Sequence, residues 1–64
     1  MIEYVKTILQ KVSFSNYLFE RELRKGLRLI SPTEIQEFKD WCYLMFGKIH
    51  KVILNRYFEP AQAF

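Results

Sequence analysis

A row of basic side chains between positions 21 and 28 is the part of this sequence best suited to binding an anion. Its members stand at i, i+3, i+4 and i+7, which places them on one helix face: Arg21, Arg24, Lys25 and Arg28. Tyr17 falls in the same arc, and cations beside an aromatic ring are typical of surfaces that bind a phosphate backbone. The face is therefore a candidate site for nucleic acid or an acidic protein, with a membrane surface or an ordinary solvated helix face as alternatives.

A helix-turn-helix motif around Gly47 is a second route to nucleic acid, because a glycine often occupies the turn of that motif. A helix after the turn would place Lys48, Lys51 and Asn55 on a face that could meet DNA. Tyr43 argues against the motif, since close packing there usually needs a small residue. Nucleic-acid binding is therefore the alternative function, not the first.

Catalysis would have to use Cys42 and His50, which are the single cysteine and histidine of the chain. Nucleophilic catalysis also needs a third group that orients the base. Cys42 lies within an apolar stripe, which is typical of an inert structural thiol. One cysteine and one histidine are too few for a structural zinc site. We therefore expect a non-enzymatic protein with no cofactor and no metal.

The segment from Ser31 to Gly47 contains the clearest helix signals. Ser31 and Glu34 form a capping-box pattern, and Pro32 falls at the first helical position. Apolar residues at helical spacing follow, and Gly47 could end the helix in a left-handed conformation. The sequence predicts a helix over residues 32–46.

Three more amphipathic segments predict an all-α fold, with helices over residues 2–12, 16–30 and 48–58. The fold class is a compact single-domain four-helix arrangement over residues 1–58, with connections of one to three residues and a frayed C-terminal tail at 59–64. The predicted core consists of Val5, Ile8, Leu9, Val12, Phe19, Leu23, Leu27, Ile35, Phe38, Cys42, Met45, Ile49, Val52 and Ile53.

Two local features concern the second helix. Ser15 is its predicted N-cap, with Phe14 and Phe19 in the positions of a hydrophobic staple. Gly26 lies on the core stripe, where it costs about 1 kcal/mol of helix propensity relative to alanine. We expect another helix to approach the backbone closely at Gly26.

Composition favours a protein partner. Half of the 64 residues are hydrophobic and 17% are aromatic, and a domain this small cannot bury all of them. The net charge of +3 is too small to indicate nucleic acid by itself. No long apolar run or signal-peptide core is present, so we expect no membrane span and a cytoplasmic location.

Self-association is the function that the sequence favours, because several large apolar residues fall outside the core stripes. The predicted surface of a two-fold homodimer consists of Trp41, Leu44, Leu54, Tyr57 and Phe58. The Tyr4 side of the first helix is the alternative surface for such a dimer.

Overall fold

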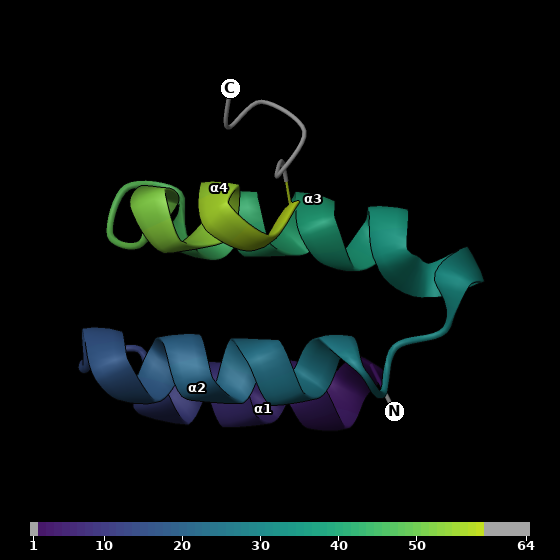
Figure 1. Ribbon diagram of the computed structural model, residues 1–64, viewed down its shortest axis with the longest axis horizontal. Helices are drawn as coiled ribbons and strands as arrows, with labels where there is room; N and C mark the ends of the chain where they lie inside the picture. Colours follow the sequence, from purple (N-terminus) through teal and green to yellow (C-terminus); the bar gives the residue numbers. More distant parts are fainter. Residues whose placement is uncertain (1, 59–64) are drawn as a thin grey trace.

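The computed structural model describes residues 2–58 and confirms the all-α, four-helix prediction. Figure 1 shows two layers, with α1 and α2 below and α3 and α4 above. The elements are α1 (Ile2–Val12), α2 (Asn16–Leu27), the 3-10 helix η1 (Pro32–Glu34), α3 (Ile35–Phe46) and α4 (Lys51–Phe58). Residues 59–64, predicted as a frayed tail, lie outside the described residues. No helix among residues 2–58 is long and apolar enough to cross a bilayer.

Each layer is a helical hairpin. α1 packs against α2, and α3 packs against α4, while the segment with η1 joins the two layers at one end (Figure 1). α2 and α4 share the near side of the molecule, where Arg56 pairs with Glu20 at 2.8 Å. α1 and α3 share the far side, where Lys6 pairs with Glu37 at 3.7 Å. The α2/α4 side is therefore one continuous face built from both hairpins.

The core lies between the two layers and is rich in aromatic rings. Phe19 of α2 meets Phe46 of α3 edge to face, with ring centroids 4.9 Å apart. Such pairs stabilise a core beyond the area they bury. The buried hydrophobic residues are Ile2, Val5, Leu9, Phe19, Leu23, Ile30, Phe38, Cys42, Phe46, Ile53 and Leu54.

The predicted N-cap of α2 is confirmed, whereas the predicted staple is wrong. Ser15 Oγ accepts a hydrogen bond from the Leu18 backbone N–H at 3.2 Å. Phe19 is buried, but Phe14 is 80% exposed and does not pack against the core. Since Ser13 Oγ and the Ser15 cap already fix the turn through backbone contacts, the turn forms without the Phe14 ring.

Each of the two glycines stands where an added Cβ atom would collide with a neighbouring atom. A Cβ on Gly26 would lie 2.5 Å from Val5 Cγ1, which confirms the predicted close approach of α1. Gly47 does not take the predicted left-handed conformation, since its φ is −59°. A Cβ there would instead collide with the Tyr43 carbonyl oxygen. Both positions therefore need glycine for the absence of a side chain.

Three predicted boundaries differ from the structure. α2 ends at Leu27 instead of Ile30, because the chain tightens as the Leu29 N–H bonds to the Gly26 carbonyl and Ile30 turns into the core. The Glu34 carboxylate accepts from the Ser31 N–H at 3.4 Å, but the turn capped in this way is the 3-10 helix η1. α4 begins at Lys51 instead of residue 48. The connections after α2 and α3 are consequently longer than predicted.

The later start of α4 changes which of its residues are buried. Ile49 and Val52, predicted in the core, are 66% and 72% exposed. Leu54, predicted on the outside, is fully buried beside Ile53. Met45 near the end of α3 is also exposed, at 45%. Because this eight-residue helix packs against both α2 and α3, its adjacent residues Ile53 and Leu54 both face the core. A single stripe of apolar residues at helical spacing therefore does not predict which residues of α4 are buried.

Candidate interaction surfaces

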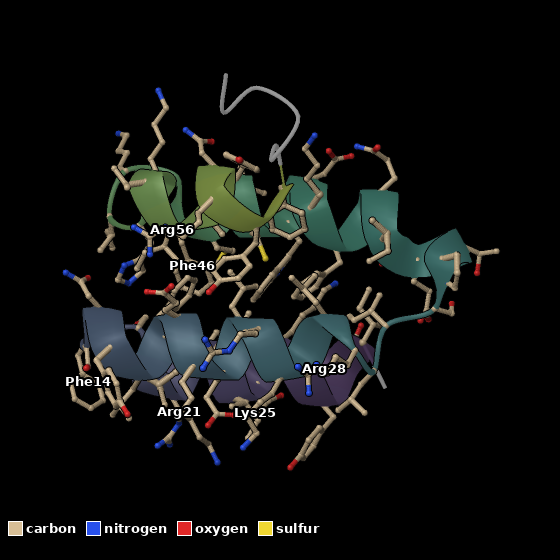
Figure 2. The ribbon with its side chains drawn as sticks, viewed as in Figure 1. Phe14, Arg21, Lys25, Arg28, Phe46 and Arg56 are labelled. Atoms are coloured by element: carbon tan, nitrogen blue, oxygen red, sulfur yellow. The ribbon has the colours of Figure 1, made fainter. Side chains whose placement is uncertain are left out.

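The predicted basic face of α2 is exposed, but the structure divides it between two sides of the helix. Figure 2 shows Arg21 and Lys25 pointing away from the upper layer. Both pair with Glu22, with nitrogen–oxygen distances of 3.2 Å and 3.6 Å. Tyr17 is 72% exposed, and the Arg21 guanidinium lies 6.0 Å from its ring centroid. Arg28 lies near the C-terminal end of α2 and forms no ion pair within the described part of the chain.

Arg24 instead faces α4, where Glu20, Arg56 and Tyr57 form a polar cluster. The Tyr57 hydroxyl and Arg56 Nη1 both donate to Glu20 Oε2 at 2.8 Å. The Tyr57 hydrogen bond, followed by that of Arg56, lowers the pKa of Glu20. The same bond raises the pKa of Tyr57. The cluster joins α2 to α4 across the near face.

Around this cluster the near face is hollowed into two adjoining cavities, which we call the α2/α4 trough. The larger, of about 440 Å³, lies between the start of α2 and the start of α4, and the smaller, of about 180 Å³, lies over Tyr17. Glu20 lines both cavities. The other charged residues that line them are Arg21, Arg24, Lys48, Lys51 and Arg56. The trough therefore combines five cations with one carboxylate.

His50 holds one end of the trough in place. Its Nε2–H donates to the Ser13 carbonyl oxygen at 2.7 Å, and its ring stacks on Phe19 with centroids 4.1 Å apart. His50 Nδ1 is buried without a hydrogen-bond partner within residues 2–58. The residue is 2% exposed, so its ring belongs to the core. His50 ties the α1–α2 turn to the α3–α4 connection.

A different hollow, the α1/α2 hollow, lies between α1 and α2. It has a volume of about 130 Å³, and Gly26 forms part of its lining. Tyr4 and Leu29 beside it are 59% and 48% exposed. Its charged lining residues, Glu22 and Lys25, pair with each other. The other residues that line it are Val5 and Ile8. The hollow is thus apolar and electrically balanced.

The surface predicted for self-association is largely used inside the monomer. Leu54 is fully buried, which excludes it from an interface between folded copies. Trp41 of α3 and the α4 residues Tyr57 and Phe58 are half-buried and pack against the core. Leu44 alone of the five is freely exposed, at 82%. The structure therefore does not bring the five residues together as one outer patch.

Comparisons of this chain with models of protein families, with curated proteins and with solved structures found no match. The function must therefore be argued from the two surfaces themselves. One is apolar and balanced in charge, and the other is strongly cationic.

The helix-turn-helix interpretation does not fit the arrangement of α3 and α4. α4 runs back along α3 as a hairpin in Figure 1, whereas that motif crosses its helices at about 90–120°. Asn55, predicted on the DNA-facing side, accepts a hydrogen bond from the Tyr43 hydroxyl at 2.6 Å. Lys48 and Lys51 instead line the trough.

The residues considered for catalysis or metal binding serve the core. Cys42 is fully buried, and burial raises the pKa of its thiol to about 12, so the thiol is protonated at neutral pH. The His50 ring is engaged by Ser13 and Phe19. No group of three or more His, Cys, Asp or Glu side chains among residues 2–58 is arranged to hold a metal ion.

Proposed function

We propose that this chain is a small, non-enzymatic protein–protein interaction module that pairs with a second copy of itself through the α1/α2 hollow. The observation that carries the proposal is the exposure of Tyr4 and Leu29 around an apolar depression lined by Gly26. Contiguous exposed apolar surface of this kind marks interaction sites. The surface lies on the Tyr4 side of α1, the alternative that the sequence offers.

Charge supports a second copy as the occupant of the hollow. Glu22 lies 3.6 Å from Lys25 within the hollow, so two copies can face each other without a net charge on either side. A two-fold dimer needs only one self-complementary patch. The α2/α4 trough does not meet this condition, because two such cationic faces would repel each other.

Size supports the same arrangement. A stable interface takes about 800 Å² from each partner, which is roughly a sixth of the 4555 Å² surface of this chain. One face of the molecule can supply that area, and the trough then remains open to solvent. The single, reduced Cys42 supports a cytoplasmic location for the dimer.

The test is the molar mass by light scattering after size exclusion, at a protein concentration of about 100 µM. We expect a dimer mass for the unmodified chain. Leu29→Glu should give a monomer, because it places a carboxylate in the apolar contact. Leu44→Glu is the matched control, since it makes the same change at an exposed leucine outside the hollow.

The two variants separate the competing surfaces. Loss of the dimer in Leu44→Glu alone would move the interface to the exposed end of α3. A monomer mass for the unmodified chain at about 100 µM would overturn the proposal. Circular dichroism of each variant establishes that a change in mass does not come from unfolding.

A further inference from the structure

The α2/α4 trough has a chemistry that pairing of two copies does not use. Glu20 is its single carboxylate among the described residues, and Arg56 and Tyr57 already satisfy that carboxylate. Lys48 and Lys51 form no ion pair with any described residue. Arg21 pairs with Glu22 and Arg56 pairs with Glu20, so Lys48 and Lys51 are the lysines left with uncompensated charge, as an anionic ligand requires.

The cations come from both hairpins and surround a concave surface. Lys48, Lys51 and Arg56 lie along the α4 side, and Arg24 lies on the α2 side. In Figure 2, Arg56 extends from α4 toward α2 across the face. A flexible anionic chain can follow such a trough and meet cations on both walls. A flat membrane surface cannot enter it, and a rigid duplex is usually read by a protruding helix or strand.

An aromatic platform at the end of the smaller cavity favours a nucleic acid over an acidic peptide. The Tyr17 ring is 72% exposed, and the Arg21 guanidinium lies 6.0 Å from its centroid. Stacking of bases on exposed rings beside cations is the way proteins bind single strands without sequence preference. An acidic peptide would use the cations but would gain little from the ring.

We propose that the α2/α4 trough binds single-stranded nucleic acid, with the cations of both walls neutralising phosphates and Tyr17 stacking on a base. The site does not depend on the proposed dimer, because the trough and the α1/α2 hollow share no lining residue. A monomeric Leu29→Glu variant should therefore bind as the unmodified chain does.

The experiment is fluorescence anisotropy with a labelled oligothymidylate of about 15 nucleotides. If three phosphates are neutralised, the affinity should fall about 20-fold between about 50 mM and about 200 mM salt. Lys48→Glu with Lys51→Glu should abolish binding at the lower salt concentration. Lys11→Glu with Lys25→Glu makes the same change in net charge away from the trough and should weaken binding only slightly.

The stacking step has its own matched pair of variants. Tyr17→Ala should weaken binding about five- to tenfold, as expected for loss of one stacked base. Tyr4→Ala removes an exposed tyrosine from the other surface and should leave the affinity unchanged. Equal losses in the two lysine pairs, or equal losses in the two tyrosine variants, would overturn the assignment. Displacement of the oligonucleotide by polyglutamate of equal charge would overturn it in favour of an acidic protein partner.

Discussion

The α1/α2 hollow and the α2/α4 trough share one helix but have opposite chemistry. Adjacent residues of α2 serve different surfaces, since Arg24 lines the trough and Lys25 lines the hollow. Glu22 pairs with Lys25 and leaves the hollow balanced in charge, whereas Glu20 is outnumbered by cations in the trough. The position of two carboxylates on one helix therefore decides which surface can face a copy of itself and which can face a polyanion.

The largest expected effect comes from a variant that tests whether the hollow and the trough depend on the same hydrophobic core. Leu23 of α2 is fully buried, so Leu23→Ala should reduce the free energy of unfolding by about 2–5 kcal/mol. Chemical denaturation at a fixed protein concentration measures this loss. We expect dimerisation and oligonucleotide binding to disappear together as the variant unfolds.

Leu44→Ala is the control for Leu23→Ala, because Leu44 is 82% exposed and lies outside the hollow. It should cost less than about 1 kcal/mol, as surface substitutions usually do. A loss below about half a kcal/mol for Leu23→Ala would mean that α2 does not anchor the core.

A substitution at His50 tests the trough, because His50 lines the trough and does not line the hollow. His50→Phe keeps a ring that can stack on Phe19 but removes the donor to the Ser13 carbonyl. Loss of the donor to this part-buried carbonyl should cost about 1 kcal/mol of unfolding free energy. Because Lys48 and Lys51 flank His50, oligonucleotide binding should weaken more than dimerisation. Equal stability of this variant and the unmodified chain would show that the Ser13 bond contributes no more than removal of the unpartnered Nδ1 returns.

Local signals explain why the α1/α2 hairpin could be predicted well from the sequence. The bounds of α1, the Ser15 cap and the close approach at Gly26 each depend on residues a few positions apart or on one unusual glycine. The same local rules placed Tyr17 and Arg21 on an exposed face. They could not show that Arg21 and Lys25 would pair with Glu22 while Arg24 faces Tyr57 of α4.

The trough could not be predicted from the sequence, because it is formed by contacts between residues that lie far apart in the chain. Glu20 meets Arg56 and Tyr57 across separations of 36 and 37 residues, and neither spacing is visible in helical periodicity. The burial of Leu54 has the same origin, because α4 is short and its neighbours on two sides set its orientation. The sequence therefore pointed to Lys48 and Lys51 as a basic face, but no signal within α4 could place them with Arg56 opposite α2.

Gly26 gives a smaller test that is confined to the hollow. Gly26→Ala should place a methyl group 2.5 Å from Val5 Cγ1 and force α1 and α2 apart. Overpacking costs about 1–3 kcal/mol, and better helix propensity returns about 1 kcal/mol, so we expect a net loss of about 1 kcal/mol in stability. The dimer should weaken, and oligonucleotide binding at the trough should not change. A gain in stability would show that α1 moves freely to accept the methyl group.

Glu20 gives the smallest expected effect on stability and connects the trough to pH. Its pKa is lowered in the folded state, so its stabilising contribution is present above the ordinary value of 4.5 and is lost as the pH falls through the folded value. Glu20→Gln should therefore cost at most about 1 kcal/mol near neutral pH, since solvent screens this exposed cluster. The difference from the unmodified chain should shrink below pH 4.5. Denaturation curves across this range measure both effects.

The control for Glu20→Gln is Tyr57→Phe, because the Tyr57 hydrogen bond contributes most to the lowered pKa of Glu20. This variant should reproduce much of the pH dependence while keeping the carboxylate. The two variants should differ at the trough, where Glu20→Gln removes a negative charge and should strengthen oligonucleotide binding, whereas Tyr57→Phe should not. Parallel stability curves for Glu20→Gln and the unmodified chain would show that the cluster does not hold α2 to α4. Unchanged oligonucleotide affinity in Glu20→Gln would place the bound phosphates away from this carboxylate.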